Sequence, residues 1–128
     1  MQKDKKIYEK WMRFAIIESI KGLESGEVPI GAIIIRDNKI IGKGYNQVET
    51  LSDATAHAEM IAITSASSTK EDWRLDDCYL FVTKEPCPMC SGAIMNSRVK
   101  GIVYGFEDEK WGACGSKYDI CRDNKSQN

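Results

Sequence analysis

The stretch YLFVTKEPCPMC at residues 79–90 decides the fold, because it reads as a buried strand, a corner and the start of a helix. The apolar residues over 78–83 predict a strand inside a sheet. Pro86 favours an extended conformation for Glu85, so the strand should run directly into the corner. Pro88 suits the first position of a helix, where its missing N–H costs nothing. The chain therefore changes from strand to helix within a few residues.

The rest of the chain predicts a hairpin and further helices around this corner. We expect helices over 5–23, 55–67 and 88–96, strands over 30–35, 39–45, 78–83 and 101–104, a polar loop at 47–54, a long loop at 105–116 and a helical turn over 117–120. Asp37 and Asn38 form the hairpin turn, and Pro29 marks a strand entrance or a loop. The hairpin and a right-handed parallel unit predict an α/β fold, a three-layer α/β/α domain with a mixed central sheet.

Composition and charge limit the class of protein. The 128 residues suit one domain, without an apolar run that could span a bilayer or a signal-peptide core, so we expect a single cytoplasmic domain over 1–128. The net charge of −1 is not that of a strongly basic nucleic-acid binder, and charge alone gives an RNA partner no support. The five cysteines are an odd number, and we expect Cys78, Cys114 and Cys121 to be inert residues in core or loop.

Three residues have the chemistry of zinc ligands. Cys87 and Cys90 are three apart, so at a helix start both sulfurs can face one ion. His57 is the only histidine in the chain and supplies a third ligand. Because structural zinc sites usually have four protein ligands, three ligands indicate a catalytic site that keeps one position for water. The alternatives are a structural zinc knuckle and a reduced cysteine pair without metal.

Glu59 supplies a carboxylate beside these ligands. It lies two residues after His57, so on a helix it does not share the direction of the imidazole. A carboxylate beside a metal, but not bound to it, can take a proton from water and return it to a leaving group. We therefore predict that Glu59 is the general acid and base of a hydrolytic reaction.

The pattern His-x-Glu followed by Pro-Cys-x-x-Cys resembles the signature of the zinc-dependent cytidine deaminase superfamily. Within it, the chain is most similar to bacterial tRNA-specific adenosine deaminases over residues 11–120. The matching segments are GEVPIGA at 26–32, TAHAEM at 55–60, WRL at 73–75, VT at 82–83, EPCPMC at 85–90, SR at 97–98, VYG at 103–105, GA at 112–113 and GS at 115–116. The segments VPIG and GACGS narrow the resemblance from the superfamily to the tRNA adenosine deaminases. Fungal-type cytosine deaminases are also similar.

The resemblance implies a function and a set of site residues. It implies a cytidine-deaminase-like homodimer with one Zn²⁺ per chain, which converts adenosine to inosine at the wobble position of a tRNA anticodon loop. The implied catalytic residue is Glu59, and the implied zinc ligands are His57, Cys87 and Cys90. The implied substrate-binding residues are Asn46, Ala58, Val28, Pro29 and Pro86. Val28 and Pro29 are equally well explained as an ordinary strand entrance, and Asn46 as a turn former.

The chain departs from the family pattern at three places. Ala54 stands where a proline is common, and Lys84 stands where an apolar residue is common. The chain also stops before the strand and the C-terminal helix that usually follow in the family, which favours a rival function, deamination of a free base or nucleoside such as cytosine or guanine. A rival of another class is an inactive zinc- or RNA-binding subunit, but such a module has no need of Glu59.

Overall fold

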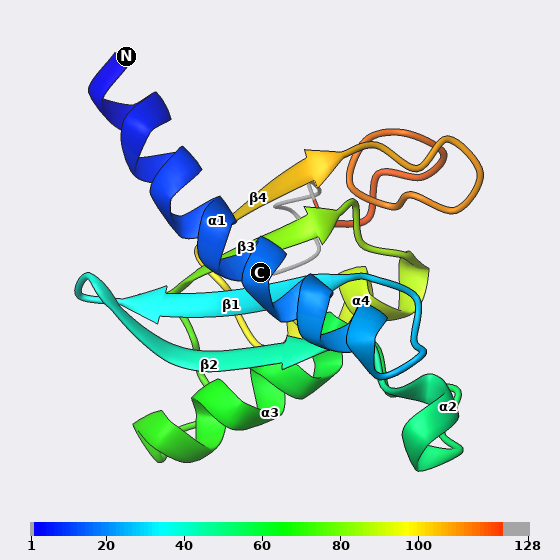
Figure 1. Cartoon of the computed structure of the whole chain (residues 1–128). Coiled ribbons are helices and arrows are strands. Elements are labelled where there is room, and N and C mark those ends of the chain that lie inside the picture. The colour runs from blue at the N-terminus through cyan, green and yellow to red at the C-terminus, as the bar shows by residue number, and fades with distance from the viewer. Residues whose placement is uncertain (1, 122–128) are drawn as a thin grey trace.

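The computed structural model describes residues 2–121 and side chains from residue 5 onward. Its elements are α1 (Gln2–Glu24), β1 (Gly31–Arg36), β2 (Lys39–Tyr45), α2 (Val48–Leu51), α3 (Ala58–Lys70), β3 (Tyr79–Lys84), α4 (Pro88–Asn96) and β4 (Gly101–Phe106). The four strands form one sheet in the order β2-β1-β3-β4 (Figure 1). No helix within the described residues is both long enough and apolar enough to cross a membrane.

The sheet is mixed, as the sequence predicts. Strand β1 pairs antiparallel with both β2 and β3, whereas β3 pairs parallel with β4. Asp37 and Asn38 join β1 to β2, and both have positive φ, at 51° and 60°. These are the angles of the two-residue turn that matches the twist of a hairpin. Strands β2, β3 and β4 therefore point the same way, and helices α3 and α4 both begin at their carboxyl edge.

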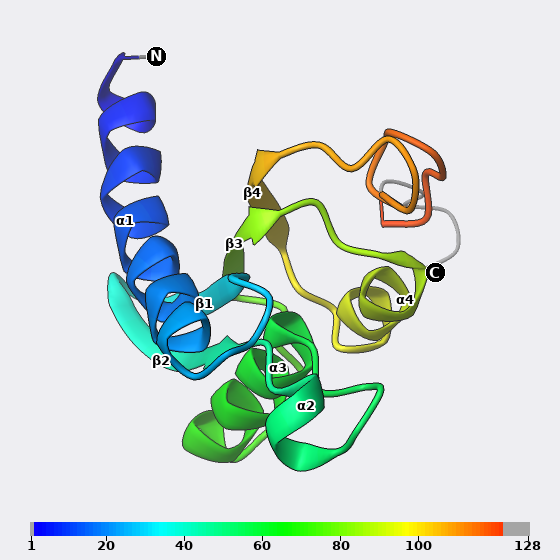
Figure 2. The ribbon, with the colours of Figure 1, turned by 45° about the vertical axis from the view of Figure 1, so that its right-hand side comes forward.

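The three-layer arrangement is confirmed. Helix α1 covers one face of the sheet, and α3 and α4 cover the other (Figure 2). Successive residues of β1 alternate between the two layers, because Ile33 packs with Trp11 and Phe81, while Ile34 packs with the apolar residues of the opposite layer. The sequence of β1 is a continuous apolar run because both of its faces are buried.

Helix α3 approaches the backbone of β2 closely, because β2 carries glycine at the contact. A Cβ on Gly44 would lie 2.7 Å from the Ala58 carbonyl oxygen, and one on Gly42 would lie 2.6 Å from the Ala66 nitrogen. Real Cβ atoms do not come this near to backbone atoms. The glycines of β2 thus fix the depth of α3, and with it the position of the first turn of that helix.

Helix α3 starts at Ala58 rather than at residue 55, and it continues to Lys70 rather than ending at 67. The late start has a local cause: the Asp53 carboxylate accepts hydrogen bonds from the backbone N–H and the hydroxyl of Thr55, at 2.8 and 2.7 Å. This turn keeps the chain out of the helix until His57, which is extended at the N-cap. Smaller differences are that α1 runs over Gln2–Glu24 and that β4 extends to Phe106.

The predicted loop at 47–54 contains the short helix α2, so that prediction is wrong. The carboxylate of buried Glu27 accepts the backbone N–H groups of Glu49 and Thr50, at 3.1 and 2.6 Å, and also the Thr50 hydroxyl. These hydrogen bonds satisfy free N–H groups at the start of α2. They join segments that lie more than twenty residues apart, so local sequence patterns do not reveal them.

The segment after β4 also differs from the prediction. Residues 117–120 form no helical turn; instead Cys114 and Asp119 form an isolated antiparallel bridge, and Gly115 N–H donates to the Tyr118 carbonyl. Cys114 and Cys121 form a disulfide with their Cα atoms 5.2 Å apart, so they are not the unpaired residues that the sequence predicts. Cys78 is free and buried, as expected.

Candidate active site

The three predicted ligand residues meet at the carboxyl edge of the sheet. His57 is the N-cap of α3, Cys87 is the N-cap of α4, and Cys90 lies in the first turn of α4. The His57 Nδ1 atom is 3.6 Å from the Cys87 sulfur and 3.5 Å from the Cys90 sulfur. The ligand atoms of all three lie within 4.8 Å of one another, so this group could hold a metal ion. The starts of α3 and α4 thus bring together His57 and Cys87, which lie 30 positions apart in the sequence.

The two cysteines of this group titrate differently. A hydrogen bond with Cys90 lowers the pKa of Cys87 to about 5, helped by backbone N–H groups at the start of α4 and by His57. The same hydrogen bond, together with burial and nearby Glu59, raises the pKa of Cys90. A bound metal ion would favour the thiolate form of both sulfurs.

Glu59 lies in the first turn of α3 and is only 4% exposed. Its burial raises the pKa of its carboxyl group to about 7, and the neighbouring Cys87 acts in the same direction. A carboxyl group with a pKa near the working pH can both accept and donate a proton, which is what a general acid and base requires. The cause is the desolvation that follows from packing the start of α3 into the site.

A cavity of about 300 Å³ opens beside these groups. It is lined by Ile30, His57, Glu59, Lys84, Glu85, Cys87, Asp108 and Trp111. Five of these residues, Ile30, Lys84, Glu85, Asp108 and Trp111, are not among the predicted site residues. The loop that follows β4 contributes Asp108 and Trp111, so this loop forms one wall of the cavity.

Sequence reasoning missed the role of Glu85, which holds this loop in place. Its buried carboxylate accepts the backbone N–H groups of Asp108, Cys114 and Ser116, at 3.1, 2.9 and 3.0 Å, and the Ser116 hydroxyl. Burial opposes ionisation of Glu85, but the hydrogen bonds from Ser116, Asp108 and Cys114 outweigh it and lower its pKa. The available signal was an acidic residue at the end of a buried strand, directly before Pro86.

The predicted substrate-binding residues do not line this cavity. Val28 and Pro29 are exposed in the segment that precedes β1. Asn46 is buried after β2, and its side-chain oxygen accepts the Val48 N–H at 3.1 Å. Ala58 is buried at the first position of α3, and Pro86 is buried with its carbonyl accepting the Ala113 N–H at 2.8 Å. These five positions remain predictions for contacts with a substrate.

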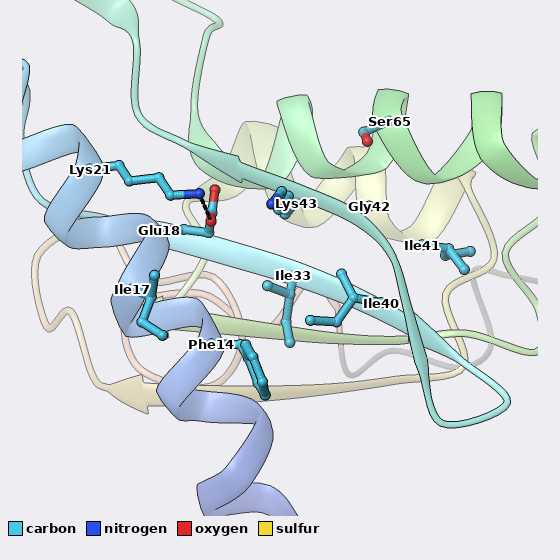
Figure 3. Close-up of a pocket in the computed structure, with 10 residues that line it drawn as sticks. All are labelled: Phe14, Ile17, Glu18, Lys21, Ile33, Ile40, Ile41, Gly42, Lys43 and Ser65. Atoms are coloured by element: carbon cyan, nitrogen blue, oxygen red, sulfur yellow. Dashed lines mark hydrogen bonds and ion pairs between the residues drawn. The ribbon is translucent and has the colours of Figure 1, made fainter.

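A second cavity, of about 440 Å³, lies between α1 and the β1–β2 hairpin (Figure 3). It is lined largely by apolar side chains, among them Phe14, Ile17 and Ile40, and an ion pair of 2.7 Å joins Lys21 to Glu18 at its edge. Within residues 2–121, its lining contains no histidine or cysteine. The first cavity is therefore the one that combines a possible metal group with a proton carrier.

Comparison with known proteins identifies the class first. The family model described as MafB19-like deaminase matches residues 7–127, nearly the whole chain. The chain is thus a deaminase.

Individual relatives give a closer identification. The tRNA-specific adenosine deaminase of Streptococcus pyogenes (serotype M18) is 44% identical over 115 residues, which are 90% of this chain and 72% of that protein. The chloroplastic tRNA(adenine(34)) deaminase of Arabidopsis thaliana is 51% identical over 108 residues, which are 84% of this chain but only 8% of that much longer protein. The chain belongs to the tRNA-specific adenosine deaminase family.

Two solved structures are similar in fold. One, from work on A-to-I editing by tRNA:A34 deaminases at the wobble position, has a TM-score of 0.82 at 39% identity and covers 84% of this chain and 83% of its own. The other is a guanine deaminase from Bacillus subtilis, with a TM-score of 0.76 at 39% identity, covering 88% of this chain and 71% of its own. Equal identity to both means that identity alone does not select the substrate.

Proposed function

We propose that this protein uses zinc to deaminate adenosine to inosine at the wobble position of a tRNA anticodon. The observation that carries the proposal is the meeting of His57, Cys87 and Cys90 with buried Glu59 at one cavity. The relatives named above support the substrate, because both curated proteins carry names of tRNA adenosine deaminases. Consistent with this function, we propose a cytoplasmic location.

The ligand spacing supports zinc as the metal. With Zn–S distances of about 2.3 Å, Zn–N distances of about 2.0–2.1 Å and tetrahedral angles, a nitrogen and a sulfur ligand are separated by about 3.6 Å. The Nδ1 atom of His57 lies 3.6 and 3.5 Å from the two sulfurs. One nitrogen and two sulfurs also form a donor set that zinc prefers over magnesium or calcium. A fourth position is left for water.

The chain's own residues divide the remaining chemistry. When bound, the zinc ion would make water a nucleophile near neutral pH. Glu59 accepts one proton from the attacking water and delivers it to the purine ring. It then accepts the second proton from the oxygen now bonded to the ring carbon and delivers it to the amino group, which leaves as ammonia. Its pKa of about 7 suits both directions of transfer. Asn46 and the backbone of Ala58 would contact the base edge, and Val28, Pro29 and Pro86 would border the base.

The test is deamination by purified, zinc-loaded protein of an anticodon stem-loop with adenosine at the wobble position. Free adenosine, cytosine and guanine are assayed in parallel, and inosine and ammonia are measured. Inosine in the stem-loop with little conversion of the free compounds would support the proposal. Asn46→Ala should reduce deamination more than RNA binding, because one base contact is lost while backbone contacts stay. Equal losses would assign Asn46 to loop shape alone.

A second candidate function is deamination of free guanine. The specific observation in its favour is the 39% identity to the Bacillus subtilis guanine deaminase. The same metal group and the same proton carrier would serve this reaction, so the two candidates differ only in the residues that select the base. Rapid conversion of guanine, with no inosine formed in the stem-loop, would decide for the guanine reaction.

We also propose a homodimer. Trp11 is only 5% exposed and packs against the sheet, so it offers no surface to a second copy. Met95 is half-buried, whereas Phe14, Ile17 and Ile20 on α1 remain exposed. The exposed side chains support a dimer, because contiguous apolar surface of this kind marks contact sites. Sedimentation showing only a monomer at micromolar concentration would refute it.

A further inference from the structure

The mouth of the active-site cavity carries a cation and an aromatic side chain that the deamination chemistry does not use. Lys84 ends β3, and Trp111 lies in the loop after β4, yet both line the cavity with Glu59. Among the described residues, Lys84 is the only lysine or arginine in that lining. We call Lys84, Asp108 and Trp111 the mouth cluster.

Asp108 positions the other two members of the mouth cluster. One carboxylate oxygen, Oδ1, accepts the backbone N–H groups of Lys110 and Trp111, at 3.0 and 3.1 Å. The other, Oδ2, pairs with Lys84 Nζ at 3.1 Å. The hydrogen bond from the Trp111 backbone and that from Lys84 hold the pKa of Asp108 below its ordinary value. Glu85 in turn accepts the Asp108 N–H, so a hydrogen bond joins the mouth cluster to the residue that directly follows β3.

The charge of this region would favour an approaching phosphate only at Lys84. Three carboxylates line the cavity, but those of Glu85 and Asp108 are each engaged by several N–H groups. Lys84 shares one of its ammonium donors with Asp108, and its side chain is still 34% exposed, against 16% for Asp108. An ammonium group has three donors, so Lys84 can contact a further acceptor without leaving Asp108.

Trp111 has a fixed backbone and an open side chain. Its N–H is bound by Asp108, and the turn is closed by the Gly112 N–H, which donates to the Asp108 carbonyl at 2.7 Å. The indole is nevertheless 56% exposed. A free base needs no binding surface beyond the cavity. A base within an RNA chain has neighbouring nucleotides, and these need a binding surface outside the cavity. Exposed aromatic side chains are the usual platform on which bases of single-stranded nucleic acid stack.

We propose that the mouth cluster is a subsite for the nucleotide next to the reacting adenosine, in which Trp111 stacks on its base and Lys84 contacts the phosphate that joins the two nucleotides. This rests on the proposed function, because it requires an RNA substrate. It also gives a role to Lys84, where the family commonly has an apolar residue. An otherwise acidic protein would thereby hold a strand through local contacts and not through bulk charge.

The test measures binding of a fluorescent anticodon stem-loop to zinc-loaded protein in a Glu59→Gln background, which avoids turnover. Three RNAs are compared: the intact loop, and loops with an abasic site directly 5′ or directly 3′ of the adenosine. Trp111→Ala should weaken binding of the intact loop by about 5- to 150-fold. It should have little effect on one of the abasic loops, because the stacked base is already missing. The matched control is Trp73→Ala, since Trp73 is 54% exposed and does not line the cavity.

Salt dependence tests the phosphate contact separately. Lys84→Met should lower the slope of log Kd against log salt by about 1, and Lys84→Arg should keep the slope. Lys100→Met is the control, since Lys100 precedes β4 at the opposite edge of the sheet. A Trp111→Ala effect equal to that of Trp73→Ala, equal losses on all three RNAs, or an unchanged slope for Lys84→Met would overturn the proposal. Deamination of the stem-loop by the unaltered protein is measured alongside: inosine formation would confine such a failure to the mouth cluster, whereas no inosine would refute the proposed function itself.

Discussion

Replacing Glu85 with glutamine should release the loop that walls the site. The carboxylate accepts four hydrogen bonds, two at each oxygen: Oε1 from the Asp108 N–H and the Ser116 hydroxyl, and Oε2 from the Cys114 and Ser116 N–H groups. An amide has only one accepting oxygen. In its better orientation the NH₂ group faces the Ser116 hydroxyl, which can accept, and only the Asp108 N–H loses its partner.

The size of the effect follows from these contacts. An unpaired N–H group that is withdrawn from water costs about 1–3 kcal/mol. The remaining bonds lose the assistance of a negative charge, which adds about 1 kcal/mol. We therefore expect Glu85→Gln to destabilise the loop by about 2–4 kcal/mol. Since the loop carries Asp108 and Trp111 into the cavity, deamination should fall as well.

Hydrogen exchange of the amides at 108, 114 and 116, together with urea unfolding, measures this loss. Glu109→Gln is the control, because Glu109 lies exposed in the same loop. The reasoning would be refuted by loop amides in Glu85→Gln that exchange no faster than those of the unaltered protein.

The same variant gives a pH dependence with a definite sign. The native pKa of Glu85 is lowered, so its stabilising effect is complete above the unfolded value of about 4.3 and is lost as the pH falls through the native value. The difference in unfolding free energy between the unaltered protein and Glu85→Gln should therefore be constant above about pH 6 and shrink in acid. A difference that grew on acidification would contradict this account.

Three further predictions concern Glu59, the predicted zinc ligand Cys90 and the packing of α3 on β2. Glu59→Gln should keep the metal but lose about 10²–10⁴ in rate, and near-normal turnover would exclude the assigned role. Because burial raises the pKa of Glu59 to about 7, the same variant should be more stable than the unaltered protein at pH 8 when both are metal-free, by up to about 3 kcal/mol. This difference in unfolding free energy should shrink towards pH 5. Cys90→Ala should abolish tight zinc binding in metal analysis of the purified protein, and near-stoichiometric zinc would refute the ligand set. Gly44→Ala should lower the free energy of unfolding by about 1–3 kcal/mol in urea, because the new Cβ would lie 2.7 Å from the Ala58 carbonyl oxygen. In the control Gly92→Ala the new Cβ meets nothing within 4 Å, and because Gly92 lies in a helix this change should raise the free energy of unfolding by up to about 1 kcal/mol. Equal effects of the two changes would argue against the close packing of α3 on β2.

Short-range sequence patterns predict most of the strands and helices, and they predict the chemistry of His57, Cys87, Cys90 and Glu59. The buried strand before Glu85, the corner at Pro86 and the helix from Pro88 follow from residue types a few positions apart, as does the turn at Asp37 and Asn38. The sequence predicts this strand over 78–83, and it runs over Tyr79–Lys84. Local sterics and local hydrogen bonds act over this range, so the pattern alone is informative.

Tertiary contacts, in contrast, determine which residues line the active-site cavity and what holds them there. The hydrogen bonds of Glu27 to α2 span 22 and 23 residues, and those of Glu85 to the wall loop span 23 to 31. The ion pair of Lys84 with Asp108 likewise joins β3 to the loop after β4. In the sequence each of these residues is an ordinary charged residue, because the partner that gives it a role is brought near only when the sheet forms and its carboxyl edge collects the loops.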